Sequence, residues 1–190
     1  RFDPEPDVCP TSAFAETELH WPRTVRRAFS DPIVPHESTG VAGRGTEEVK
    51  TNAVTGRLRR GEAGFTVEFG RPGLGARFRD IDRVTRALAA AGAHFEQANP
   101  VTSLMSDPAA GQIRDDILGE KLLSAIVELK TRMDRVPEIL RALRAIASEV
   151  ETVICLGVSA RCDAGGDTEL AEVLRAEGFA FWRGKTNLGL

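Results

Sequence analysis

Residues 122–159 read LLSAIVELKTRMDRVPEILRALRAIASEVETVICLGVS, and this stretch decides the fold class. Ala125-Ile126-Val127-Glu128-Leu129 can place its side chains alternately on two faces as a half-buried strand does. Asp134 can cap the helix that follows, because Pro137 suits a first helical turn and apolar residues then recur at helical spacing. Thr152–Ser159 is nearly all apolar or β-branched, which predicts a buried strand. The stretch therefore predicts a β-α-β unit.

The segments on either side continue the pattern. We expect a helix over Thr168–Glu177, ended by Gly178, and a last strand over Phe179–Arg183. Upstream, Gly64–Gly70 reads as a strand, Asp80–Ala91 as an amphipathic helix and His94–Ala98 as a short strand. The sequence thus predicts an α/β or α+β fold, with one mixed sheet and helices packed on it.

The segment Gln112–Met133 fits two interpretations. Its apolar residues would serve one face of a long helix, or two strands, Gln112–Leu118 and Leu122–Thr131, that turn at Gly119. We favour the strand hairpin, because a glycine costs a helix interior about 1 kcal/mol.

A short internal similarity suggests a topology. Val67-Glu68-Phe69 precedes one predicted helix, and Val127-Glu128-Leu129 precedes another. Two β-α-β units of this kind could form the halves of a ferredoxin-like sandwich.

The predicted strands and helices define an expected core. Ile126–Lys130, Val153–Val158 and Phe179–Trp182 should be neighbouring strands of one sheet. The residues expected to be almost fully buried are Leu140, Leu143, Ile146, Ile154, Leu156, Val173 and Leu174.

The first residues have a different composition from the rest. Residues 1–45 are rich in proline, glycine and polar residues, which predicts an irregular N-terminal arm with one short helix around Arg23–Phe29. Residues 46–190 are expected to form a single α/β domain, with a further strand at Glu48–Thr51.

Composition restricts the class of protein. The chain is 42% hydrophobic and 28% charged, as folded soluble proteins are, and no apolar run approaches the length of a membrane span. Cys9, Cys155 and Cys162 are odd in number and form no CxxC pair, which indicates a reducing, cytoplasmic setting. Cys155 lies in an apolar run and is expected to be a small core residue.

Three residues suggest a catalytic site. If 112–131 is a hairpin, Asp116 and Glu128 can point to one edge, with Lys130 on the same face as Glu128. Carboxylate oxygens bind Mg²⁺, which can stabilise a phosphorane and activate a water that the lysine orients. We therefore predict Asp116, Glu128 and Lys130 as catalytic residues, with Asp116 and Glu128 as the metal ligands.

This arrangement resembles the restriction-endonuclease-like superfamily, whose motif is an Asp followed at a variable distance by Asp/Glu-x-Lys on a strand. The resemblance covers roughly residues 110–185. It implies Asp116 (or Asp115) and Glu128 as ligands of Mg²⁺, Lys130 as the motif lysine, and DNA as the substrate. A second Glu-x-Lys, Glu48-Val49-Lys50, is a weaker candidate for the same strand.

The net charge of −3 hides an excess of basic residues between Arg23 and Arg86, which permits a DNA-binding face. Two other functions stay open. One is a ferredoxin-like domain that binds a small molecule or regulates without catalysis. The other is an unrelated enzyme with its site in the loops Gly70–Arg79 and Ala160–Asp167. We expect no membrane partner, and a homodimer is left open.

Overall fold

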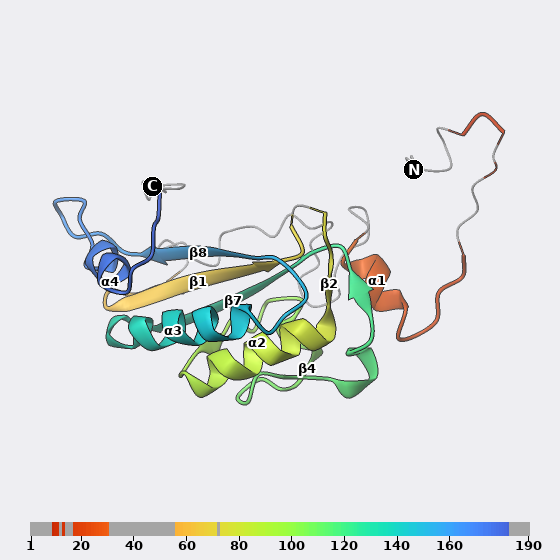
Figure 1. Ribbon diagram of the computed structural model, residues 1–190, viewed down its shortest axis with the longest axis horizontal. Coiled ribbons are helices and arrows are strands. Elements are labelled where there is room, and N and C mark those ends of the chain that lie inside the picture. The colour runs from red at the N-terminus through yellow and green to blue at the C-terminus, as the bar shows by residue number, and fades with distance from the viewer. Residues whose placement is uncertain (1–8, 12, 14–16, 31–55, 72, 183–190) are drawn as a thin grey trace.

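The computed structural model describes residues 9–11, 13, 17–30, 56–71 and 73–182. Four strands form its main sheet in the order β3-β7-β1-β8, and every neighbouring pair is antiparallel (Figure 1). Their bounds are β1 Glu62–Phe69, β3 His94–Phe95, β7 Ala125–Arg132 and β8 Ile154–Ala160. The expected α+β class, with helices packed on one sheet, is confirmed.

Two helices cover one face of this sheet. Helix α2, Phe78–Ala90, lies between β1 and β3 in the chain, and helix α3, Val136–Ala147, lies between β7 and β8. The two helices pack against each other below the sheet in Figure 1. The resulting β-α-β-β-α-β order is that of a ferredoxin-like sandwich.

The internal similarity coincides with a local pseudo-twofold arrangement. Val67 of β1 lies directly opposite Val127 of β7. The residues on either side pair in the same way, Thr66 with Glu128 and Glu68 with Ile126. A twofold axis between the two valines therefore exchanges β1-α2-β3 with β7-α3-β8. The two triplets that follow these strands in the sequence, Asp82-Arg83-Val84 and Asp134-Arg135-Val136, do not follow this axis, since the first lies inside α2 whereas the second ends at the first residue of α3.

The core lies between the sheet and the two helices. Phe65, Val67 and Phe69 of β1 alternate toward the helices and are completely buried. The helices meet them with apolar residues at helical spacing, and these residues are also buried: Ile81, Val84 and Leu88 from α2, and Val136, Ile139, Leu140 and Leu143 from α3.

Shorter elements complete the described residues. The helices are α1 Thr24–Ala28 and α4 Leu170–Ala176, and the strands are β2 Ala76–Arg77, β4 Met105–Asp107, β5 Gln112–Ile113 and β6 Lys121–Leu122. Single 3₁₀ turns are η3 Thr102–Leu104, η4 Asp115–Ile117 and η5 Met133–Arg135. The expected arm helix is thus present as α1, and its Phe29 packs edge-on against Phe78, with ring centroids 5.5 Å apart.

The predicted hairpin of Gln112–Leu118 with Leu122–Thr131 is wrong. β5 pairs with β4, β6 pairs with β2, and β7 pairs with β1 and β3. The cause lies in α2, because the Asp82 carboxylate accepts a hydrogen bond from the Ile113 N–H and the Thr85 hydroxyl donates to the Gly111 carbonyl. These buried bonds hold the chain along the helix instead of in the sheet.

Three further expectations need correction. Phe179–Trp182 forms no strand, and β1 lies between β7 and β8. Cys155 is exposed, because it points to the face of the sheet that the helices leave uncovered. Of the expected core residues, Leu140, Leu143 and Leu174 are buried, whereas Ile146, Ile154, Leu156 and Val173 are only partly buried.

Some expectations fall outside the described residues, namely the strand at Glu48–Thr51, the second Glu-x-Lys and most of the arm 1–45. Within the described part of the chain, no helix has the length and apolar character needed to cross a membrane.

Candidate functional site

Glu128 lies in the middle of β7 and points away from the helices. Its side chain is almost inaccessible, with 2% of the residue exposed. The Asn99 amide donates a 2.7 Å hydrogen bond to its carboxylate and a second bond, of 3.0 Å, to the Ile126 carbonyl. Glu128 therefore helps to anchor the loop that follows β3, as a buried carboxylate needs hydrogen-bond partners.

Lys130 shares this face of β7, two residues further on. Its ammonium donates to the Glu62 carboxylate at 3.1 Å and to the Arg57 carbonyl at 3.1 Å. Burial raises the pKa of Glu62, but hydrogen bonds from the Arg59 backbone N–H and from Lys130 outweigh burial and leave that pKa below its ordinary value. Lys130 thus joins β7 to the start of β1.

Asp116 lies elsewhere, in the 3₁₀ turn η4. Its exposed carboxylate accepts hydrogen bonds from the Arg114 guanidinium at 2.8 Å and from the Trp21 indole at 2.7 Å. The bond from Arg114, followed by the bond from Trp21, lowers the pKa of Asp116. Arg114 also stacks over the Trp21 ring, 4.7 Å from its centroid, so that this cluster attaches the segment before α1 to the domain.

The three predicted residues therefore occupy two places. Asp116 belongs to a segment that packs along α2, on the helix side of the sheet, whereas Glu128 and Lys130 lie on the opposite face. Among the described residues, no three His, Cys, Asp or Glu side chains come together as a metal-binding group. Asp116 and Glu128 consequently do not fit the Mg²⁺ ligand pair that the hairpin would have formed.

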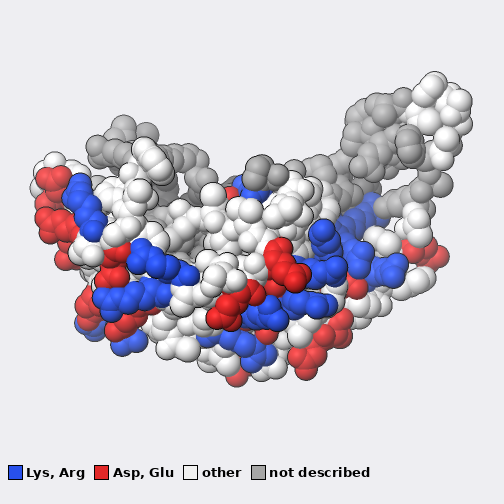
Figure 2. Space-filling model, viewed as in Figure 1, with Lys and Arg blue, Asp and Glu red and all other residues white. Residues whose placement is uncertain are grey.

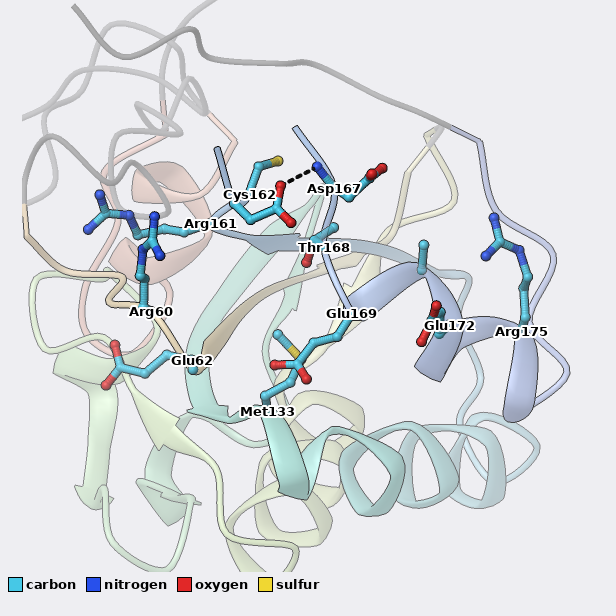
Figure 3. A pocket seen from close by; sticks show the side chains of 13 residues that line it. Arg60, Glu62, Met133, Arg161, Cys162, Asp167, Thr168, Glu169, Glu172 and Arg175 are labelled. Carbon is cyan, nitrogen blue, oxygen red and sulfur yellow. Dashed lines mark hydrogen bonds between the residues drawn. The ribbon is translucent and has the colours of Figure 1, made fainter. Parts of the chain in front are cut away.

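A cavity of about 530 Å³ opens at the other end of the sheet, where β1 begins and β8 ends (Figure 3). Its walls come from the turn before β1, from Met133 after β7, and from the loop between β8 and α4 together with α4 itself. The lining residues include Arg60, Glu62, Arg161, Asp163, Glu169 and Glu172.

One carboxylate shapes the loop wall of this cavity. Asp163 accepts hydrogen bonds from the backbone N–H groups of Gly165, at 2.8 Å, and Asp167, at 3.0 Å. This Asx-type turn fixes the path of the loop between β8 and α4. Figure 3 shows the bond to Asp167 at the rim.

Other charged groups of the cavity keep their hydrogen-bonding capacity. Arg60 and Arg161 lie close together on one side in Figure 3, and Glu169 extends toward the centre, above Met133. Within the described residues, the side chains of Arg60, Arg161 and Glu169 make no hydrogen bond or ion pair with another residue, and all three are exposed. The cavity thus presents cations and a carboxylate that the protein itself does not neutralise.

The helix layer has a different charge pattern. Acidic and basic side chains are interspersed over the face shown in Figure 2. Arg86 pairs with Asp82 at 2.8 Å, and Arg83 lies 3.8 Å from Asp80. This face therefore carries charges of both signs, some of them paired.

Comparisons with protein-family models, with curated proteins and with solved structures found no match to this chain.

Sequence reasoning located part of the cavity. The loop Ala160–Asp167, named as the site of an alternative enzyme, forms one wall, whereas Gly70–Arg79 does not line it. Arg60 and Glu169 were not singled out. Their only signal is position, since Arg60 precedes a predicted strand and Glu169 lies at the start of a predicted helix, and the sequence does not show that these two places meet.

Proposed function

We propose that the chain is a non-catalytic, ferredoxin-like binding domain whose cavity takes a small ligand carrying both a negative and a positive group. One observation carries this proposal. Side chains of both signs line a cavity of about 530 Å³ without neutralising one another. A volume of this order suits a small molecule.

The residues suggest how such a ligand lies. A guanidinium donates two parallel hydrogen bonds to a carboxylate, so Arg60 and Arg161 suit the negative group. The Glu169 carboxylate accepts hydrogen bonds from an ammonium, and Met133 offers apolar contact between the two ends. A free amino acid or a short peptide has this distribution of charge.

Calorimetry with free amino acids and dipeptides tests the proposal. Each compound is compared with its amidated or acetylated form, which lacks one of the two charges. We expect the doubly charged forms to bind and each blocked form to bind about tenfold more weakly, since charge-assisted hydrogen bonds contribute roughly 1.5–3 kcal/mol. Arg60→Ala and Glu169→Gln should weaken binding to a similar extent.

Two variants serve as matched controls. Arg59→Ala removes the neighbouring arginine and Glu149→Gln removes an exposed carboxylate, and neither side chain lines the cavity. Both controls should bind as the wild type does. Absence of binding by any of these ligands at millimolar concentration, or equal affinity in Arg60→Ala and Arg59→Ala, would contradict the proposal.

The Mg²⁺-dependent nuclease acting on DNA is a second candidate, supported by the common face of Glu128 and Lys130 on β7. It predicts a rise in thermal stability with Mn²⁺ and DNA cleavage that Glu128→Ala abolishes in a folded protein. Because Asp116 lies apart and Glu128 is bonded to Asn99, we expect neither effect.

A further inference from the structure

Strand β8 forms one edge of the sheet, and its composition does not protect that edge. No described strand pairs with its outer side. Its sequence, ICLGVSA, has no charged residue and no proline over seven residues. Exposed edges usually carry such residues, because unpaired backbone groups otherwise template pairing with another chain.

The backbone of β8 shows which groups point outward. The Gly70 N–H donates to the Val153 carbonyl at 3.1 Å, which places Val153 among the residues whose backbone groups face β1. Because this direction alternates along an antiparallel strand, the N–H and C=O groups of Ile154, Leu156 and Val158 face the outer edge. Within the part of the chain that the structure describes, no strand bonds to these groups.

The side chains of the same three residues are also incompletely covered. Ile154, Leu156 and Val158 lie opposite Phe69, Val67 and Phe65 of β1, on the helix side of the sheet. The β1 residues are fully buried, yet the β8 residues are only partly buried. An apolar strip therefore follows the open edge.

We propose that two copies of this chain associate through β8, each strand pairing antiparallel with its counterpart about a twofold axis at Leu156. Such pairing satisfies the outward backbone groups of both copies and makes one continuous sheet. Leu156 then meets Leu156 of the second copy, and Ile154 meets Val158, so that the two apolar strips cover each other.

The charges beyond the ends of β8 favour this antiparallel arrangement. Glu151 and Arg161 each lie five positions from Leu156, on opposite sides, and both are exposed. Glu151 precedes β8 by way of a bend and Arg161 directly follows it, so an antiparallel dimer with its axis at Leu156 brings the Glu151 end of one strand beside the Arg161 end of the other, twice. A parallel arrangement would instead place like charges together at each end, so the flanking charges favour the antiparallel dimer.

A charge-exchange experiment on the full chain tests the dimer and its antiparallel arrangement. Sedimentation equilibrium without added ligand should show a dimer in the micromolar range. Glu151→Arg replaces two attractive pairs with two repulsive ones, and we expect the dissociation constant to rise at least about tenfold. Glu151→Arg combined with Arg161→Glu should restore the affinity. Because Arg161 also lines the cavity, the Glu151 variant, which lies outside it, is decisive.

A second variant tests the strand edge itself. Val158→Lys places a charge on the apolar strip and should give a monomer, while Arg59→Ala should dimerise as the wild type does. Circular dichroism confirms that each variant is folded. A wild-type monomer at all concentrations, or a dimer unchanged by both Glu151→Arg and Val158→Lys, would overturn the proposal.

Discussion

β1 and β8 are adjacent strands whose helix-side residues are apolar in both, yet these residues differ sharply in burial. The helix-side residues of β1, from Ala63 to Phe69, are completely buried, whereas every residue of β8 is at least partly exposed. The register places Phe65 directly opposite Val158, so the two strands share one layer. Burial here depends on neighbours at both sides of a strand, and β8 has a described neighbour on only one.

The outer faces of the two strands differ in a related way. β1 presents Glu62, Thr66 and Glu68 to the face that points away from the helices, and Glu62 bonds to Lys130 of β7. β8 presents the small residues Cys155, Gly157 and Ser159. The edge strand β8 therefore carries small, uncharged side chains on this face, and a second backbone can approach it closely.

The largest expected effect is in β1. Phe65→Ala removes a large, fully buried side chain between the sheet and the helices, so we expect a loss of about 3–5 kcal/mol in the free energy of unfolding. Urea denaturation measures it. A loss below about 1 kcal/mol would mean that neighbouring side chains fill the space left by the Phe65 ring, and that β1 is packed no more tightly than β8.

A matched pair of substitutions sharpens the comparison. Val67→Ala and Val158→Ala remove the same atoms from the same side of the sheet, but only Val67 is fully buried. We expect a loss of about 2 kcal/mol for Val67→Ala and less than about 1 kcal/mol for Val158→Ala, both measured in the Glu151→Arg background to limit association. Equal losses of stability in the two variants would show that the Val158 side chain is as well buried as that of Val67.

The pattern of the sequence predicted the regular elements well, because each carries its own signal. β1, β7 and β8 alternate or are β-branched, and α2 and α3 repeat apolar residues at helical spacing. The same signals could not show that Ile154 and Leu156 lie at an edge. A strand at an edge and a strand in the middle of a sheet have the same composition when the edge carries no protective charge.

The residues between β3 and β7 were predicted poorly, because tertiary contacts determine their path. Ile113 and Ile117 are completely buried, as a strand or helix pattern suggests, yet they belong to a short strand and a 3₁₀ turn against α2. The bond from Ile113 to Asp82 spans 31 residues, and local periodicity carries no record of it. The predicted site at Asp116, Glu128 and Lys130 required the hairpin. Without the hairpin, Asp116 lies on the other side of the sheet from Glu128 and Lys130.

The smallest expected effect concerns the ion pair that joins β1 to β7. The pKa of Glu62 lies below its ordinary value of 4.5, since the bonds from Arg59 and Lys130 outweigh the opposing effect of burial. The unfolded chain therefore binds this proton more tightly than the folded chain does. The stabilisation is complete above the unfolded pKa and is lost as the pH falls through the folded pKa.

Glu62→Gln should remove this contribution. The side chains of Glu62 and Lys130 are 24% and 40% exposed, so solvent screens the pair and the loss at neutral pH should be only about 0.2–1 kcal/mol. Urea denaturation at a series of pH values should show the wild type and the variant converging in acid, while Glu149→Gln, at an exposed carboxylate, should follow the wild type throughout. A difference in unfolding free energy that stays the same below the folded pKa would mean that Glu62 stabilises β1 by packing and not through its ion pair with Lys130.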